Sequence, residues 1–361
     1  MSLVLDLGSY SVKAGLSSDE VPHEIRSIVG QSRLESGGPY IGDSAVALGN
    51  SVVLSEPISE GMIDNCDELE LILDLIYSLT KATDFPVVVA EPVFNSEPKR
   101  EELTELLFEK FSIPELNITM QGILTLVGTG RVTGLVLDCG YGLCQTVPVF
   151  ESYVLPHSIG ALRLGGKDLD SLLAKLIALQ GPSLTKTADR ETLRKIKHKL
   201  CYCRTAPEST LTASVEKYTL PDGTSIALSE ERFIVPEAYF SPGLVGAEGN
   251  GLAELVAECI RNSPIDLTRP LVNNIILAGG SSMFEGFTQR LSAEVKMRVS
   301  AKMSRDVKIV GPADRNLSTW NGGKAFAELR DSFAERWLRR EEYDEYGAQY
   351  IHSKVMSHKH S

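Results

Sequence analysis

The chain lacks any apolar run near the length of about 20 residues that a membrane-spanning helix needs. Basic residues are also in short supply, with 36 Lys and Arg against 48 Asp and Glu and a formal net charge of -12. This charge disfavours direct nucleic-acid binding and broad attachment to anionic membranes, so an anionic ligand would need a local site. Met1-Ser2-Leu3 leads into an apolar segment without a basic region, so we expect neither a signal peptide nor membrane insertion.

Cysteines are few and are not spaced as zinc ligands. Cys201-Tyr202-Cys203 has one residue between its thiols, unlike the spacing of a zinc knuckle. The six cysteines lie mostly inside apolar patterns, which favours buried free thiols in a reducing compartment. We therefore expect a cytoplasmic protein, with hydrophobic and charged fractions of 43% and 23% that are typical of a soluble globule.

One feature that the chain does have is a repeated segment. Leu-Val-Leu-Asp-Leu-Gly at residues 3–8 recurs as Leu-Val-Leu-Asp-Cys-Gly at residues 135–140. Each copy predicts a buried strand that ends in a sharp turn, where glycine lets backbone N–H groups approach an anion and aspartate can hold a hydrated cation. One such turn is commonly only structural. Two nearly identical copies favour a phosphate and metal site in a cleft between two related α/β lobes.

Two further segments fit the same site. Residues 9–16 alternate as a returning strand, so they predict a hairpin in which Lys13 can point back at the first turn. A third apolar run, residues 275–282, ends in glycines and serines without a carboxylate. It could contact a different part of the same ligand.

Periodicity predicts the remaining elements. We expect an exposed loop at 31–43, a buried strand at 85–91, a hairpin turning at Pro221-Asp222-Gly223, and helices at 69–79, 101–111, 166–179, 188–202, 252–260 and 324–337. The helix at 188–202 carries Glu191, Arg194 and His198 along one stripe, with Lys197 beside it. Such a stripe could line a cleft, although alternating charge is also typical of a solvated helix face.

Ordered motifs along nearly the whole chain resemble actin and the actin-related proteins, within the superfamily of the sugar kinases and the 70-kDa heat-shock chaperones. The most specific are Lys13-Ala14-Gly15, Met120-Gln121, Thr146-Val147-Pro148-Val149-Phe150, Gly166-Lys167-Asp168, Gly279-Gly280-Ser281-Ser282-Met283, Trp320-Asn321-Gly322-Gly323 and Glu341-Glu342-Tyr343-Asp344-Glu345-Tyr346-Gly347. The resemblance implies an actin-like ATPase fold of two duplicated α/β lobes. It divides into four subdomains: 1–27, 55–128 and 318–361; 28–54; 129–164 and 248–317; and 165–247.

The resemblance also implies ATP or ADP with Mg²⁺ or Ca²⁺ in the cleft. Asp6 and Asp138 would hold the metal through water molecules. Gln121 would position the water that attacks the nucleotide, and Asp138 is also expected to act in hydrolysis. The other residues expected at the nucleotide are those of the phosphate loops, the nucleoside pocket and the adenine cover: Gly8, Ser9, Tyr10, Lys13, Gly140, Tyr141, Gly142, Gly166, Asp168, Glu191, Arg194, Lys197, Gly279, Gly280, Ser281, Met283 and Phe284.

This chain departs from the family at residues that are expected to bind and hydrolyse the nucleotide. Conventional actin has an aspartate where Tyr141 lies, a histidine where Gln145 lies, and a glycine where Tyr10 lies; His198 and Asn316 replace a glutamate and a lysine near the nucleoside. Neutral Gln145 cannot take a proton from water. The loop at 33–40 is shorter than the loop that enters the neighbouring subunit of an actin filament, so we expect weaker longitudinal contacts. These changes indicate a divergent actin-related protein.

Four functions can be compared at this point, and the first two fit best. The first is a nucleotide-binding subunit of a cytoskeletal filament or larger assembly, with slow or absent hydrolysis and with actin-family subunits or actin-binding proteins as partners. The second is an ATPase that cycles nucleotide as it polymerises. A nuclear role in a chromatin complex fits less well, and a kinase would need a further carboxylate base in the cleft, which the sequence beside the phosphate loops does not offer.

Overall fold

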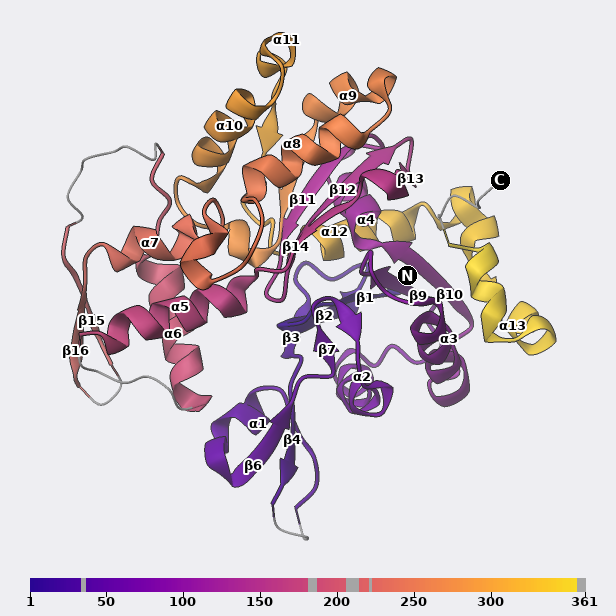
Figure 1. Cartoon of the computed structure of the whole chain (residues 1–361). Coiled ribbons are helices and arrows are strands. Elements are labelled where there is room, and N and C mark those ends of the chain that lie inside the picture. Colours follow the sequence, from indigo (N-terminus) through magenta and orange to yellow (C-terminus); the bar gives the residue numbers. More distant parts are fainter. Residues whose placement is uncertain (34–36, 181–186, 206–213, 221–222, 356–361) are drawn as a thin grey trace.

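The computed structural model describes residues 1–33, 37–180, 187–205, 214–220 and 223–355. Figure 1 shows two α/β lobes, the first built on strands near the N-terminus and the second on strands from the middle of the chain. A smaller module projects from each lobe. The mixed α/β fold agrees with the architecture expected from the sequence.

The first lobe is built on a six-stranded sheet in the order β19-β10-β9-β1-β2-β3. Strand β1 pairs antiparallel with β2 and parallel with β9, so the predicted hairpin and the predicted buried strand are both confirmed. The small projecting sheet has the order β5-β4-β6. The bounds are β1 Leu3–Leu7, β2 Ser11–Leu16, β3 His23–Arg26, β4 Val29–Ser32, β5 Tyr40–Ile41, β6 Val52–Ser55, β9 Val87–Glu91, β10 Glu115–Met120 and β19 Leu338–Arg339.

The second lobe repeats this arrangement. Its sheet has the order β13-β12-β11-β17-β18, with β14 also paired to β12. Strand β11 pairs antiparallel with β12 and parallel with β17, as β1 does with β2 and β9, so the sequence repeat corresponds to a structural repeat. The bounds are β11 Gly134–Cys139, β12 Cys144–Phe150, β13 Tyr153–Val154, β14 Gly160–Leu162, β17 Ile275–Ala278 and β18 Ile309–Val310.

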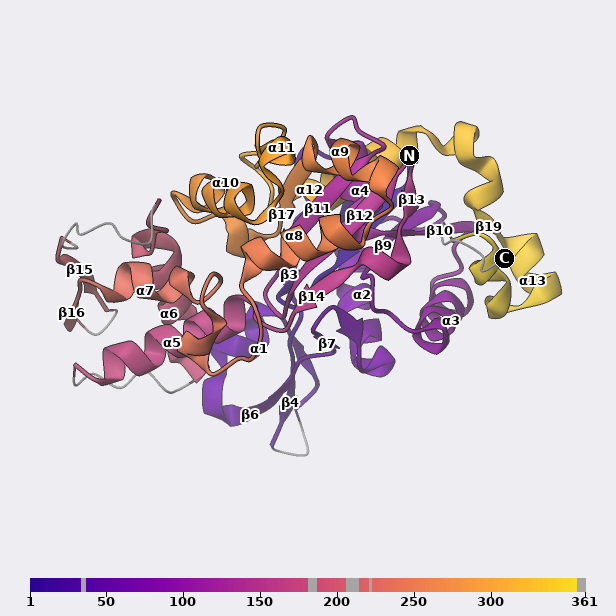
Figure 2. The same cartoon turned by 45° about the horizontal axis from the view of Figure 1, so that its top comes forward.

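Helices cover the outer faces of both sheets (Figures 1 and 2). Apolar stripes explain their packing: in α2 the residues Leu69, Ile72, Leu73 and Ile76 are fully buried, and Asn65 caps the first turn. The outer helices of the first lobe are α2 Cys66–Thr80, α3 Glu97–Glu105 and α13 Arg340–Tyr346. Those of the second are α8 Leu252–Asn262, α9 Ile265–Val272 and α10 Phe287–Arg298. The module that projects from the second lobe contains α5 Gly166–Ala178, α6 Thr187–Leu200 and α7 Glu231–Glu237 (Figure 1).

Two helices, α4 (Gln121–Gly128) and α12 (Ser318–Glu328), lie between the sheets and carry the chain from one lobe to the other. Their backbones touch at glycines. A Cβ added to Gly322 would lie 1.7 Å from the carbonyl oxygen of Leu124, and one added to Gly128 would lie 3.0 Å from the Cα of Gly322. Glycine is therefore required at this crossing.

Several predicted bounds were wrong. The loop expected at 31–43 contains the end of β4 and all of β5, because its polar residues belong to a small exposed sheet. The helix expected at 324–337 begins at Ser318 and ends at Glu328, followed by a 3-10 segment. The helix expected at 101–111 is α3 followed by a π-helical turn at Leu106–Lys110. The predicted hairpin forms from β15 (Glu216–Thr219) and β16 (Ser225–Leu228), but residues 221–222 of its turn lie outside the described residues.

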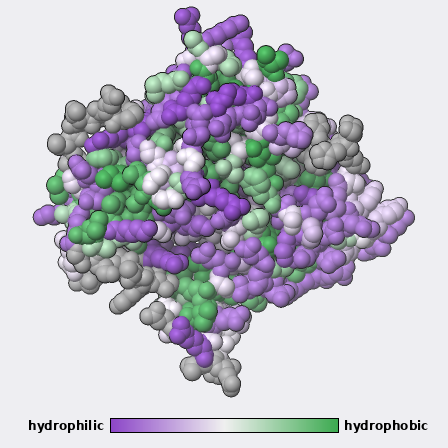
Figure 3. All heavy atoms as spheres, viewed as in Figure 1, coloured by the Kyte–Doolittle hydropathy of each residue, from purple (hydrophilic) through white to green (hydrophobic). Residues whose placement is uncertain are grey.

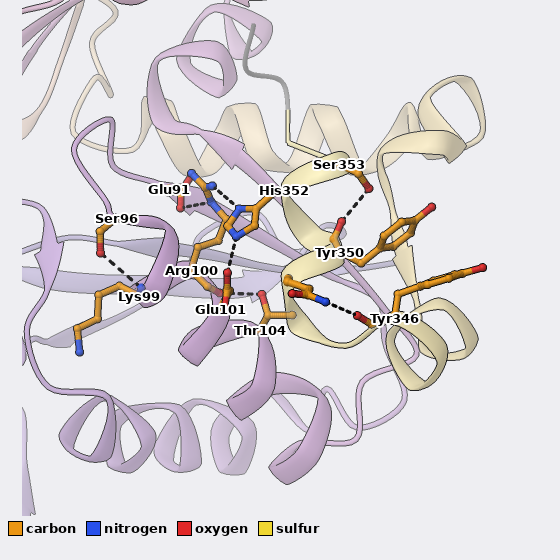
Figure 4. A network of polar contacts seen from close by, with 11 residues as sticks. Glu91, Ser96, Lys99, Arg100, Glu101, Thr104, Tyr346, Tyr350, His352 and Ser353 are labelled. Carbon is orange, nitrogen blue, oxygen red and sulfur yellow. Dashed lines mark hydrogen bonds and ion pairs between the residues drawn. The ribbon is translucent and has the colours of Figure 1, made fainter. Parts of the chain in front are cut away.

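A buried polar network fixes the segment after α13 onto α3 (Figure 4). Arg100 donates two hydrogen bonds of 2.8 Å to the carboxylate of Glu91 and lies 2.9 Å from Nδ1 of His352. The other ring nitrogen of His352 lies 2.7 Å from Glu101. Because Arg100 and Glu91 are both buried, this ion pair links the sheet, α3 and the C-terminal segment.

The cysteines are free, and all except the partly exposed Cys66 are buried, in agreement with the sequence. Among the described residues, each helix is too short or too polar to cross a lipid bilayer. The face in Figure 3 mixes hydrophilic residues with small hydrophobic patches.

Candidate functional site

A cavity of about 360 Å³ lies between the lobes, where the repeated turns meet. The turn after β1, the turn after β11 and the glycines after β17 all border it. Of the residues predicted from the sequence, the lining includes Asp6, Gly8, Ser9, Tyr10, Lys13, Gln121, Asp138, Gly140, Tyr141, Gly142, Arg194, Lys197, Gly279, Gly280, Ser281 and Met283. The structure thus brings together segments that are up to 277 residues apart, from Asp6 to Met283.

The first turn presents one carboxylate and one cation. Asp6 lies opposite Lys13 in the β1–β2 register, and its Oδ2 is 3.4 Å from the Lys13 ammonium. Its Oδ1 accepts a hydrogen bond of 3.1 Å from the side-chain amide of Gln121, the first residue of α4. Lys13 therefore points back at the turn, as the hairpin predicts. Asp6, which the resemblance assigns to the metal, also orients the side chain of Gln121.

The second turn presents the other carboxylate. Asp138 lies opposite Gln145 in the β11–β12 register and accepts a hydrogen bond of 3.4 Å from its amide. Burial and the nearby negative charge of Asp6 raise the pKa of Asp138 to about 6. A cation between these carboxylates would remove that repulsion.

The glycines around Asp138 lie where the chain packs too closely to accept a side chain. Gly279 has a φ of +82°, and a Cβ there would lie 2.4 Å from Oδ1 of Asp138. A Cβ on Gly142 would lie 3.3 Å from the hydroxyl oxygen of Ser9, across the cavity from its own turn. Backbone groups of both lobes therefore border the cavity closely, as an anion such as a phosphate chain requires.

The donor set fits a divalent metal that keeps most of its water. Mg²⁺ is commonly bound through one or two carboxylates together with ligand phosphates and water molecules. Asp6 and Asp138 are such a pair, with Lys13 available for phosphate oxygens. Across the residues that the structure describes, His, Cys, Asp and Glu form no group of three or more that could hold a metal ion.

Helix α6 borders the cavity with Arg194, Lys197 and His198. Lys197 forms an ion pair of 2.8 Å with Asp170 and donates a hydrogen bond of 2.8 Å to the carbonyl oxygen of Gly166. Burial lowers the pKa of Lys197 despite the nearby carboxylate. Burial also lowers the pKa of Arg194 to about 10 and that of His198 to about 4. His198 is therefore neutral at physiological pH.

Four predicted site residues are absent from the cavity lining. Asp168 accepts a hydrogen bond of 2.8 Å from the backbone of Gly165 at the start of α5, and Gly166 accepts one from Lys197. Glu191 forms an ion pair with Arg26 and borders a second cavity. Phe284 packs against the hydrophobic core of the second lobe.

The structure adds polar lining residues that sequence reasoning missed, namely Ser11, Glu24, Arg315 and Thr319. Ser11 is two residues before Lys13 in β2, so strand alternation could have placed it on the same face. Glu24 is the cross-strand neighbour of Lys13 and accepts a hydrogen bond of 2.6 Å from Ser11. The sequence offers no extra aspartate beside the phosphate loops, but the pairing of β3 with β2 brings the glutamate Glu24 to the cavity lining.

The chain was compared with models of known protein families. The family model described as Actin matches residues 1–356. The matched range contains both repeated turns, the two crossing helices and every residue of the cavity lining.

Proposed function

Because this chain belongs to the actin family, we propose that it binds ATP or ADP with Mg²⁺ or Ca²⁺ in the cavity between its lobes. In this role it is a subunit of a cytoskeletal filament or a larger assembly and hydrolyses nucleotide slowly or not at all. Actin-family subunits or actin-binding proteins are the proposed partners, and the cytoplasm is the proposed location; assembly in a nuclear chromatin complex is the less favoured alternative.

One observation carries the proposal of a nucleotide. Asp6 and Asp138 end equivalent strands of the two lobes and border the same cavity, together with Lys13 and close glycine backbones. Burial and the negative charge of Asp6 raise the pKa of Asp138, and a cation bound in this cavity would favour the ionised carboxylate. Bound phosphate would complete the ligands of the metal and be contacted by Lys13.

The proposal of slow hydrolysis follows from the residues beside the carboxylates. Gln145 is an amide where conventional actin has a histidine, and Tyr141 takes the place of an aspartate. A neutral amide can orient water but cannot accept its proton. The remaining groups suit holding a nucleotide better than splitting it.

Nucleotide retention tests the proposal directly. Protein purified in Mg²⁺ should release ATP or ADP on denaturation, detected by ion-exchange chromatography, at close to one molecule per chain. Asp6→Ala and Asp138→Ala should abolish this retention, whereas Asp74→Ala, which removes an exposed carboxylate on α2, should retain it. Wild-type protein that carries no nucleotide, even after incubation with ATP and Mg²⁺, would contradict the proposal.

The cycling ATPase remains the second candidate because Gln121 is held 3.1 Å from Asp6, at the edge of the cavity. In that case phosphate release should accelerate on polymerisation, and Gln121→Ala should slow it by about tenfold or more. Equal phosphate release from the variant and the wild type would remove Gln121 from the reaction.

A further inference from the structure

Tyr10, in the turn after β1, makes contacts with the opposite lobe through three parts of its side chain. Its hydroxyl donates a hydrogen bond of 3.3 Å to Glu191, and its ring lies 3.3 Å from the guanidinium carbon of Arg194. The ring also meets Tyr141 edge to face, with centroids 5.2 Å apart. One side chain of the first lobe therefore contacts both α6 and the second turn.

Arg26 in β3 strengthens the same contact from the first lobe. Its Nη1 lies 2.8 Å from Glu191, and its guanidinium carbon lies 4.6 Å from the Tyr10 ring. The side chains of Arg26 and Glu191 are only 14% and 30% exposed, so water screens this ion pair less than a surface pair. We call Tyr10, Arg26, Tyr141, Glu191 and Arg194 the Tyr10 cluster.

The Tyr10 cluster lies between two cavities. Tyr10, Tyr141 and Arg194 border the main cavity, whereas Arg26, Tyr141 and Glu191 border a second cavity of about 310 Å³ beside the small β4–β6 sheet. The cluster thus separates the two spaces. Tyr141 borders both cavities and contacts Tyr10 edge to face.

We infer that the Tyr10 cluster holds the lobes closed and limits the rate at which bound nucleotide leaves the main cavity. This inference rests on the proposed nucleotide binding. Separation of the lobes would break the cation–π contact, the aromatic contact and the ion pair together, since every one joins the first lobe to the second.

The first test measures nucleotide release. Protein loaded with a fluorescent ATP analogue is mixed with excess ATP, and the loss of fluorescence gives the release rate. Tyr10→Leu keeps an apolar side chain but removes the ring face and the hydroxyl, and we expect release to be about ten- to a hundredfold faster. Tyr10→Phe keeps the ring and should change release only severalfold. Tyr346→Leu, at an exposed tyrosine of α13, is the matched control and should release at the wild-type rate.

The second test needs no nucleotide. Spin labels at Ala47→Cys on α1 (Asp43–Ala47) and Ala178→Cys on α5, in a Cys66→Ser background, report the distance between the lobes by double electron–electron resonance. In nucleotide-free protein, Tyr10→Leu should lengthen and broaden this distance distribution. If Tyr10→Leu does not fold, Glu191→Gln provides the same test, because the amide weakens the ion pair with Arg26 and leaves the rings in place.

The two tests separate the inference from the function on which it rests. An unchanged release rate together with an unchanged distance distribution would overturn the role of the Tyr10 cluster. If no variant binds nucleotide but the distance distribution responds, the nucleotide proposal fails and the closure of the lobes stands. Faster release with a broader distribution supports both.

Discussion

The side-chain amide of Gln145 lies 3.4 Å from the carboxylate of Asp138, directly across the β11–β12 ladder. Strand pairing fixes this neighbour, so whichever residue occupies position 145 faces the carboxylate. An amide there can donate a hydrogen bond but has no pKa in the neutral range. The residue at position 145 therefore decides whether the second turn offers a side chain that can take a proton from water.

Replacement of that amide should restore a titratable group. We expect Gln145→His to raise the single-turnover rate of phosphate release from bound ATP by about tenfold or more, because imidazole can accept a proton near neutral pH. The rate should rise with pH as the imidazole loses its proton. Gln145→Asn, which keeps an amide, is the control. A histidine variant no faster than the asparagine variant would show that the base is not what limits hydrolysis.

The Asp138 carboxylate should cost the nucleotide-free protein stability at neutral pH. Its pKa is about 6 in the folded protein, above the ordinary value of 3.8, so the folded state binds more protons than the unfolded chain between these values. The stabilisation by its proton is complete below pH 4 and is lost as pH rises through 6. Asp138→Asn should thus raise the free energy of unfolding at pH 7.5 by about 1–2 kcal/mol and by less at pH 5.

Urea unfolding in EDTA at the two pH values measures this difference. Asp74→Asn, at an exposed carboxylate, should change the free energy of unfolding little at either pH. A loss of stability in Asp138→Asn at pH 7.5 would contradict the cost that burial and the charge of Asp6 place on the ionised carboxylate.

The network around Arg100 should be essential for stability (Figure 4). Arg100→Ala leaves the buried Glu91 carboxylate without its bidentate partner and should lower the free energy of unfolding by about 3–5 kcal/mol. The neighbouring Lys99→Ala removes an exposed ion pair with Glu102 and should cost less than about 1 kcal/mol. Chemical denaturation of both variants gives the comparison, and similar losses would show that the network contributes little.

Close backbone contact makes position 322 intolerant of a side chain. A Cβ at Gly322 would lie 1.7 Å from the carbonyl oxygen of Leu124, so we expect Gly322→Ala to lower the free energy of unfolding by about 3 kcal/mol. Gly243→Ala places its methyl group in open space and should cost almost nothing. Thermal unfolding of the two variants measures the effect. Equal unfolding midpoints would contradict the prediction.

The sequence was sufficient for the parts of the site that strand pairing fixes. Asp6, Lys13 and Asp138 follow from the repeated turns and from a tight hairpin, because period-two alternation determines which side chains face the same way. Glu24 was missed since its place depends on the pairing of β3 with β2, which no local pattern specifies. Glu191 lies on the helical stripe as predicted, but its carboxylate forms an ion pair with Arg26 from the other lobe. The sequence pattern of the helix does not reveal that partner.

The bounds of elements were harder to predict for a related reason. Helix α12 begins at Ser318 because its glycine-containing first turns pack against α4, a tertiary contact that offsets the poor helix propensity of Gly322 and Gly323. Read locally, those glycines indicate a break, so the predicted helix began after them.

The contact of α4 with α12 makes the two crossings of the chain neighbours in space. Both connecting segments meet there backbone to backbone, so the glycine contact joins the lobes through the main chain itself. In the closure that we propose, the Tyr10 cluster joins the same lobes at a second place, through side chains alone. A variant in the cluster would then release one of the two connections and leave the other in place.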